Sequence, residues 1–273
     1  MRLAVVALGV LALSGCGGSD EAAKTTPWPD SMVVLGHSGA TGFNSDPTEP
    51  FSDARENSWA TGSNRAVNSL YRRILAHNPA IKGHNANLAK DGGTIDDLVV
   101  QVRRATELEP KPQLVVIQIL DNDITCDGSD RKRYAPFGRK FAGALRQLSS
   151  RDPGVRIFVV SQYGRPERFF DAVKDDPLAT AKYSEPGPCG AFEDGTMVPE
   201  HIAYLTKVVE AYEDQEATAW KRFAGCYFSR SALRDAVDSR ERMAPDLDHL
   251  SIAGHQHAAE VAWPALVAAF NYG

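Results

Sequence analysis

Short apolar runs alternate with amphipathic stretches along this chain, and that alternation constrains the fold more than any other feature. Residues 32–35, 114–120 and 155–160 are rich in β-branched side chains and are bounded by polar or turn residues. Uniformly apolar strands of this kind suit a parallel sheet that is covered on both faces. A weaker run at residues 81–88 predicts one more strand.

Helical patterns lie between these runs. In residues 94–108 the apolar positions share one helical face, and Thr94 with Asp97 forms a capping box that predicts a helix start at Thr94. Further helices are expected at residues 137–148, 199–212 and 251–270. Pro264 should disturb the last of them. Strands that alternate with helices predict a single three-layer α/β/α domain, with long loops in the segment 164–197, which is rich in Gly, Pro and charge.

The first residues have the pattern of an export signal. Arg2 precedes an apolar segment, residues 3–13, that is too short to span a bilayer. Leu13-Ser14-Gly15-Cys16 resembles the bacterial lipobox, whose cysteine is acylated and becomes the first mature residue; a plain secretory signal is the alternative. We therefore expect a signal peptide at 1–16 with lipidation at Cys16, a linker at 17–30 and one domain at 31–273. The protein would be exported and held at the cell membrane or in the periplasm.

Net charge indicates which binding partners to expect, and the cysteines indicate a disulfide. A formal net charge of −5 gives no reason to expect nucleic acid, and we expect a monomer that meets the membrane only through its anchor. In an oxidising compartment a disulfide is expected among Cys126, Cys189 and Cys226, but the sequence leaves all three pairings open.

A serine and an acid–base pair stand near opposite ends of the chain. Ser38 lies in a Gly-rich turn directly after the first predicted strand, where a nucleophile can project into the ligand crevice of an α/β sheet. Asp246 precedes His249 by three residues, so one loop can deliver a base and the carboxylate that orients it. Taken alone, each feature is also compatible with an ordinary turn. His37 should be a flanking residue, and Asp248 is expected to point away from His249.

Two other turns could bind developing negative charge. Gly92 and Gly93 precede the capped helix, where unpaired N–H groups gather. Asn122 follows the 114–120 strand, and its carboxamide can donate to an oxyanion. The acids nearby also permit a divalent-metal site built from Asp121, Asp123, Asp246, Asp248 and His249. That alternative is disfavoured because nothing spaces these residues as a ligand set.

Four sequence blocks, in this order, resemble those of the SGNH or GDSL family of esterases and lipases. The first is residues 36–42 with Ser38, the second contains Gly92, the third contains Asn122, and the last is Asp246 with His249. The resemblance implies a flavodoxin-like parallel sheet of about five strands. It implies that Ser38 is the nucleophile, His249 the base and Asp246 its orienter. The oxyanion would be held by the N–H groups of Ser38 and Gly92 and by the Asn122 side chain. The reaction would be ester hydrolysis through an acyl-enzyme, without a cofactor or a metal.

Two positions depart from the family pattern. His37 stands where the first block usually has Asp, and Leu120 stands where the third block usually has Gly. A side chain at 120 is expected to crowd the oxyanion site and to limit substrate size. The α/β-hydrolases also order their triad Ser, Asp, His, but they place the serine after several strands and the acid far from the histidine.

The expected function is therefore a lipid-anchored serine esterase acting on a small-molecule or glycan ester. A carbohydrate O-acetyl esterase, an acyltransferase of the same fold and a non-catalytic carbohydrate-binding lipoprotein are the alternatives. Loops at 43–60, 126–136 and 164–197 are expected to select the substrate.

Overall fold

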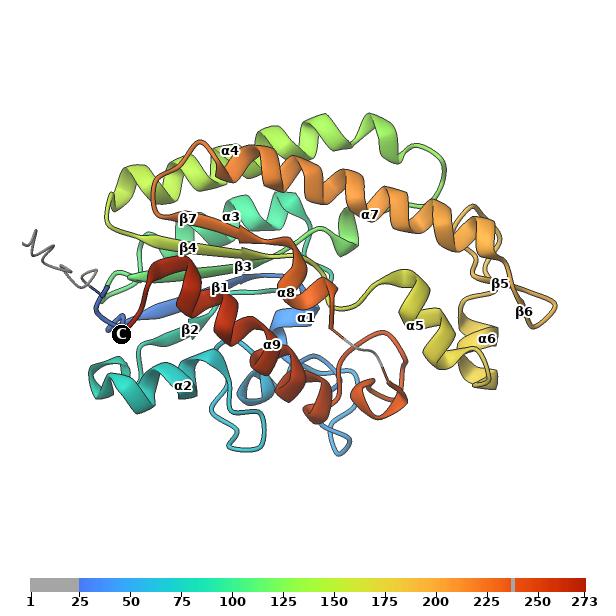
Figure 1. The fold of residues 1–273 in the computed structure, drawn as a ribbon, viewed down its shortest axis with the longest axis horizontal. Coiled ribbons are helices and arrows are strands. Elements are labelled where there is room, and N and C mark those ends of the chain that lie inside the picture. The colour runs from blue at the N-terminus through green and yellow to red at the C-terminus, as the bar shows by residue number, and fades with distance from the viewer. Residues whose placement is uncertain (1–24, 237–238) are drawn as a thin grey trace, which may run out of the picture.

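The computed structural model describes residues 25–236 and 239–273. These residues form a central five-stranded sheet with helices on both faces (Figure 1). Across the sheet the strands are β2 (Asn85–Asn87), β1 (Met32–Gly36), β3 (Leu114–Gln118), β4 (Arg156–Val160) and β7 (Cys226–Ser229). All four neighbouring pairs are parallel, which confirms the predicted sheet. The expected signal peptide and Cys16 lie outside the described residues.

The strand order has a functional consequence. Ranked along the chain, the five strands lie in the order 2-1-3-4-5, which is the flavodoxin-like arrangement. The order reverses between β1 and β3, and ligands of such sheets bind at this switch point, outside the carboxyl ends of the strands. Ser38 directly follows β1, and Asn122 lies in the turn that follows β3. The topology therefore brings two of the predicted site residues to one edge.

Each face of the sheet has its own layer of helices. One face carries α3 (Ile95–Ala105), α4 (Tyr134–Arg151) and α7 (Pro199–Trp220), and the other carries α2 (Leu70–His77), α8 (Arg230–Arg234) and α9 (Ile252–Phe270). Because successive strand residues point to opposite faces, Val33 packs in the first core and Val34 in the second. No helix among the described residues is long and apolar enough to cross a membrane.

The helices follow their sequence signals with some differences. Helix α3 begins after Thr94, and the capping box with Asp97 is formed, as predicted. Helix α7 runs beyond the expected end to Trp220, and α9 continues through Pro264. The edge strand β7 was not predicted, because the four residues that form it are too few to show a clear strand pattern in the sequence.

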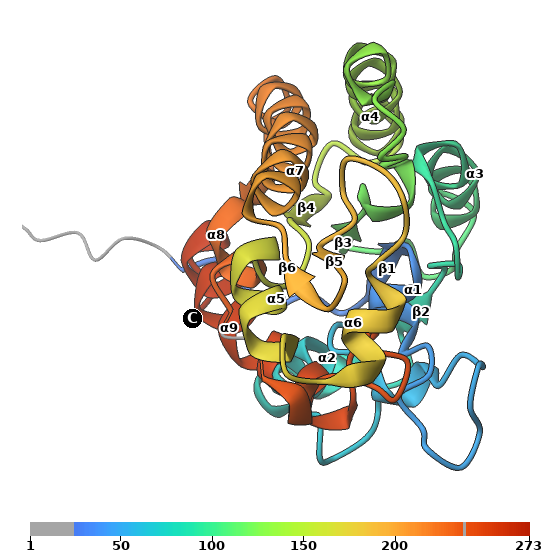
Figure 2. The same ribbon diagram turned by 90° about the vertical axis from the view of Figure 1, so that its right-hand side faces the viewer.

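The expected long loops at 164–197 are the main correction. This segment contains α5 (Pro166–Val173), α6 (Pro177–Lys182) and a hairpin of β5 (Phe192–Glu193) and β6 (Thr196–Met197). The prolines suggested loops, but Pro166 and Pro177 occupy the first turn of their helices, where a missing N–H costs nothing. We call residues 166–197 the cap, since they stand in front of the carboxyl edge of the sheet (Figure 2).

A disulfide joins the cap to the segment that follows β3. Cys126 pairs with Cys189, and Cys226 is buried and forms no disulfide with the other cysteines of the described residues. This bond resolves the pairing that the sequence left open, and it links the cap to the segment between β3 and α4.

The domain begins earlier than the predicted boundary at residue 31. Thr26 donates its N–H to Asn271 O, and the Trp28 ring stacks on Trp263 with ring centroids 5.3 Å apart. Residues from 26 onward therefore pack on the domain, although their composition is typical of a linker.

Candidate active site

Ser38 is held at the end of β1 by a turn that requires glycine. Gly36 adopts a φ of +140°, and a Cβ there would lie 1.8 Å from Gln118 O. The Gln101 side chain of α3 accepts from Gly36 N–H at 2.6 Å and donates to Gly36 O at 2.8 Å. Ser38 is the first residue of the short helix α1 (Ser38–Thr41) and is largely buried. The nucleophile candidate thus sits on a rigid strand-to-helix turn.

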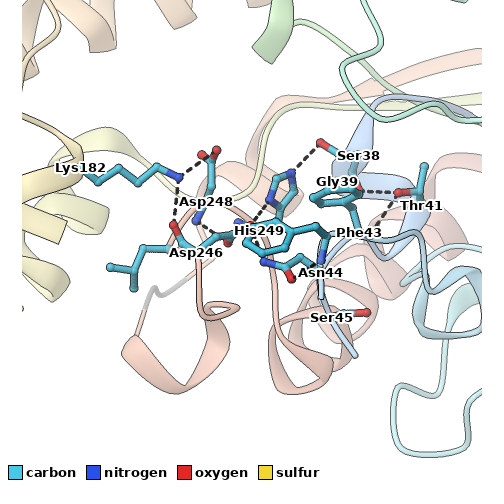
Figure 3. A network of polar contacts seen from close by, with 12 residues as sticks. Ser38, Gly39, Thr41, Phe43, Asn44, Ser45, Lys182, Asp246, Asp248 and His249 are labelled. Atoms are coloured by element: carbon cyan, nitrogen blue, oxygen red, sulfur yellow. Dashed lines mark hydrogen bonds and ion pairs between the residues drawn. The ribbon is translucent and has the colours of Figure 1, made fainter. Parts of the chain in front are cut away.

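The structure brings the three predicted catalytic side chains together (Figure 3). His249 Nε2 lies 2.9 Å from Ser38 Oγ, and His249 Nδ1 lies 2.8 Å from Asp246 Oδ2. Both distances are those of hydrogen bonds, and together they join residues 211 positions apart. His249, not the adjacent His37, contacts the serine hydroxyl. The arrangement can move a proton from the hydroxyl to an imidazole that a carboxylate orients.

Asp246 is an ionised acceptor with several donors around it. Its Oδ1 accepts the backbone N–H groups of Asp248 and His249 at 3.0 and 3.1 Å, and its Oδ2 accepts the Asn44 amide at 2.6 Å. Burial alone raises the pKa of Asp246, but the hydrogen bonds from His249, Asp248 N–H and Asn44 outweigh burial and hold that pKa well below its usual range. Asp246 is therefore a charged carboxylate at neutral pH.

Asn44 and Phe43 are site residues that sequence reasoning missed as such. Asn44 is buried, adopts a φ of +56°, and anchors its Oδ1 on Phe51 N–H while its amide holds Asp246. The Phe43 ring packs against the His249 ring at a centroid distance of 4.7 Å. No spacing in the sequence connects residues 43–44 with the loop at 246–249, so only the fold reveals these contacts.

Acidic neighbours raise the pKa of His249. Burial lowers the pKa of His249, but the Asp246 hydrogen bond and the charges of Asp246, Asp248 and Asp91 together raise it above its ordinary value. Asp248 points away toward Lys182, with an N–O distance of 3.2 Å, as predicted, so it acts on His249 only through its charge.

We expect the pH profile of hydrolysis to report this tuning. Only neutral His249 can accept a proton, so kcat/KM should rise with pH through the raised pKa and fall below it. Asp248→Asn removes a negative charge and should move this acidic limb to lower pH. The control is Asp152→Asn, at the far end of the strands just before β4, whose profile should match that of the wild type. Profiles of kcat/KM against pH for the three proteins check the prediction, and an unmoved limb in Asp248→Asn contradicts it.

The predicted oxyanion donors lie at the same edge. Asn122, in the 3₁₀ turn Asp121–Asp123, directs one N–H to Gly93 O at 3.1 Å, which leaves its second N–H for a ligand. Gly92 adopts a φ of +63° in the turn before α3, between Asp91 of the cavity wall and Gly93. These positions are compatible with the predicted roles.

Leu120 does not crowd the site as expected. Its φ of +150° is a backbone conformation that glycine adopts readily and that other residues rarely adopt. Its side chain is fully buried in the core formed with α3, α4 and α7, and it does not line the cavity. The chain thus retains the backbone course typical of glycine and turns the leucine side chain into the core.

The alternative metal site finds no support in the contacts. Asp123 Oδ2 accepts Ile95 N–H at 2.9 Å, and His249 is engaged by Asp246 and Ser38. Within residues 25–236 and 239–273, no group of three or more His, Cys, Asp or Glu side chains is arranged to hold a metal ion.

A cavity of about 460 Å³ opens beside Ser38 and His249. One part of its wall is polar and comes from the turns after β1, β3 and β4. The other part is apolar and includes Ile124, Phe169, Phe170, Leu205, Met243 and Leu247. The cap supplies Phe169 and Phe170, whose rings pack edge-on against Tyr183. The site can therefore accept an ester that carries an uncharged hydrocarbon group.

Solved structures resemble this fold at low sequence identity. A carbohydrate esterase family 2 enzyme with a carbohydrate-binding domain, from Corynascus thermopiles (Myceliophthora fergusii), has 14% identity and a TM-score of 0.52 over 91% of this chain and 69% of its own. A family two carbohydrate esterase from Clostridium thermocellum has 15% identity and a TM-score of 0.51 over 89% and 65%. Phospholipase A1 from Streptomyces albidoflavus has 13% identity and a TM-score of 0.50 over 86% and 98%. These likenesses show the fold.

The sequence itself identifies the family. No curated protein matches it at a significant level. The family model described as GDSL-like Lipase/Acylhydrolase matches residues 32–262, which include β1, the turn with Asn122 and the Asp246–His249 loop. The chain therefore belongs to the GDSL-like lipase/acylhydrolase family and is an ester-bond hydrolase.

Proposed function

We propose that this chain is an exported, lipid-anchored serine esterase that hydrolyses carboxylic esters through Ser38, His249 and Asp246. The observation that carries the proposal is the unbroken series of contacts Ser38–His249–Asp246, with distances of 2.9 and 2.8 Å at the cavity wall. Nucleophile, base and orienter are the three parts that serine hydrolysis requires.

Each residue has one task in the proposed reaction. Ser38 Oγ attacks the ester carbonyl carbon while His249 Nε2 takes the hydroxyl proton. The negative charge on the carbonyl oxygen is held by the N–H groups of Ser38 and Gly92 and by the Asn122 amide. The bond to the alkoxy oxygen breaks, and the alcohol leaves with the proton from His249. Water then attacks the acyl-Ser38 ester by the same route and releases the acid.

Fluorophosphonate labelling tests the proposal against a non-catalytic carbohydrate-binding protein of the same fold. An activated serine reacts with the probe, whereas a binding module does not. We expect stoichiometric labelling of Ser38, and strongly slowed labelling in His249→Ala, which keeps the serine and removes its base. If the folded wild-type protein stays unlabelled, the proposal is wrong.

The cavity favours esters larger than acetate. Phe169 is half-buried on α5 and lines the apolar wall, so it offers contact area to an acyl chain. In a series of p-nitrophenyl esters we expect kcat/KM to be higher for butyrate than for acetate, and Phe169→Ala should reduce that preference. Leu178→Ala, on the exposed side of α6, is the matched control and should keep the preference.

The opposite preference points to one of the alternatives. Acetate favoured over all longer chains, together with release of acetate from acetylated polysaccharides, indicates a carbohydrate O-acetyl esterase instead. Transfer of the acyl group to an added alcohol in preference to water indicates an acyltransferase, and product analysis distinguishes it.

Export and anchoring rest on the first sixteen residues. Labelled palmitate should enter the wild-type protein and not Cys16→Ala; equal or absent incorporation contradicts lipidation. We further propose a monomer without a nucleic-acid partner, in keeping with the net charge of −5.

A further inference from the structure

His37 and Asp121 form a second His–Asp pair in the cavity wall, which the proposed reaction does not use. His37 Nε2 lies 3.2 Å from Asp121 Oδ2. The imidazole is almost fully buried, with 5% of its side chain exposed, whereas the Asp121 side chain is 37% exposed toward the cavity. The pair joins the turn after β1 to the turn after β3, and these turns carry Ser38 and Asn122.

The other side of the His37 ring holds the nucleophile turn. His37 is the N-cap of α1, and its Nδ1 accepts the Gly39 backbone N–H at 3.0 Å. A backbone N–H can only donate, so Nδ1 must carry a lone pair. The proton of neutral His37 therefore sits on Nε2, the nitrogen that faces Asp121. A carboxylate at that place favours this tautomer and keeps Nδ1 free to cap Gly39.

Packing leaves the ring few alternatives. A Cβ on Gly39 would lie 2.7 Å from His37 Cε1, so the ring lies flush against the turn it caps. The His37 backbone N–H donates to Gln118 O of β3 at 3.3 Å. A shift of the His37 ring would therefore displace the turn that positions Ser38.

Asp121 depends on the same contact. Asp121 Oδ1 and His37 Nε2 are both buried without a hydrogen-bond partner among the described residues, so the two side chains meet as facing polar groups 3.2 Å apart. Burial raises the pKa of Asp121. An aspartate at position 37, the usual residue of the family, would face Asp121 with like charge. His37 and Asp121 are therefore matched to each other in this chain.

We propose that the His37–Asp121 contact sets the spacing between two of the three oxyanion donors, the Ser38 N–H and the Asn122 amide. Both residues are positioning residues: His37 acts through the α1 turn, and Asp121 acts through His37. This inference rests on the proposed esterase function. It predicts that loss of the contact lowers kcat and leaves KM nearly unchanged, because the oxyanion forms only after substrate has bound.

A double-mutant cycle tests the proposal. His37→Asn retains an acceptor that can cap Gly39 N–H but is too short to reach Asp121. Asp121→Ala removes the other partner, and Asp121→Asn keeps a side chain of the same length with an oxygen beside Nε2. We expect each of His37→Asn and Asp121→Ala to lower kcat for p-nitrophenyl butyrate by about 10- to 100-fold, below the loss caused by removing a whole oxyanion donor.

The sharper expectation concerns the double variant. If both residues act through one contact, His37→Asn/Asp121→Ala should be no worse than the poorer single variant, since little remains to be lost. Asp121→Asn should recover most of the kcat that Asp121→Ala loses. Losses that multiply in the double variant, or single variants with wild-type kcat, overturn the proposal.

Folding and the parent proposal are separated by two further readings. Urea midpoints identify any variant that is merely destabilised; if His37→Asn does not fold, the comparison of Asp121→Asn with Asp121→Ala decides, and equal kcat values overturn the proposal. If Ser38→Ala keeps wild-type turnover, the esterase mechanism itself fails. An active, Ser38-dependent enzyme with multiplicative losses contradicts only the positioning role.

Discussion

Ser38→Ala is expected to abolish the hydrolysis of p-nitrophenyl esters, with a fall in kcat of about 10⁵- to 10⁶-fold. The proposed reaction begins with attack by the hydroxyl that hydrogen-bonds to His249 at 2.9 Å, and alanine removes that atom alone. KM should change little, since the hydroxyl contributes a small part of the cavity wall. Steady-state kinetics with purified protein measure the effect.

The fold of Ser38→Ala must be intact for this result to count. Among the described residues, the hydrogen-bond partner of Ser38 Oγ is His249. The circular dichroism spectrum and melting temperature of Ser38→Ala should therefore match those of the wild type. Turnover retained in a folded Ser38→Ala protein contradicts a serine mechanism.

Asp246→Asn is expected to lower kcat by about 10⁴-fold through a change of tautomer. The backbone N–H groups of Asp248 and His249 both donate to Oδ1, so they orient the carbonyl oxygen of an asparagine to that position. The new NH₂ then occupies the place of Oδ2, where it faces His249 Nδ1 and also loses the Asn44 amide hydrogen bond that Oδ2 accepts in the wild type. His249 must accept there and carry its proton on Nε2, where it can no longer act as a base toward Ser38.

Asp248→Asn is the matched control for this substitution. It makes the same chemical change two residues away, on a side chain that faces Lys182. Measured at a pH above the titration of His249, Asp248→Asn should retain most of the wild-type kcat. Equal losses in the two variants would mean that the loop as a whole, and not the tautomer, controls activity.

Much of the fold follows from local signals in the sequence. The buried strands β1, β3 and β4 are continuous apolar runs, and the capping box at Thr94 and Asp97 marks the start of α3. Strand β7 was not predicted because its run is only four residues long, although Tyr227 and Phe228 are residues that favour strands. The helices of the cap were not predicted, because prolines such as Pro166 and Pro177 occur at helix starts as well as in turns.

The candidate site also contains residues that the sequence predicts and residues that it does not. Ser38, Asp246 and His249 belong to motifs whose order along the chain is informative, and the structure brings all three together. Asn44 and the His37–Asp121 pair depend on contacts across the sheet edge that no local pattern encodes. Leu120 gave a wrong expectation, because the direction of its side chain follows from a backbone φ that a sequence does not display.

The covalent intermediate provides the most direct test of the central claim. The wild-type protein should be quenched in acid during turnover of p-nitrophenyl butyrate and mapped by mass spectrometry of its peptides. We expect a butyryl group on Ser38 in the wild-type protein and none in Ser38→Ala. Sustained turnover with no acyl group on Ser38, or with the acyl group on another residue, would contradict it.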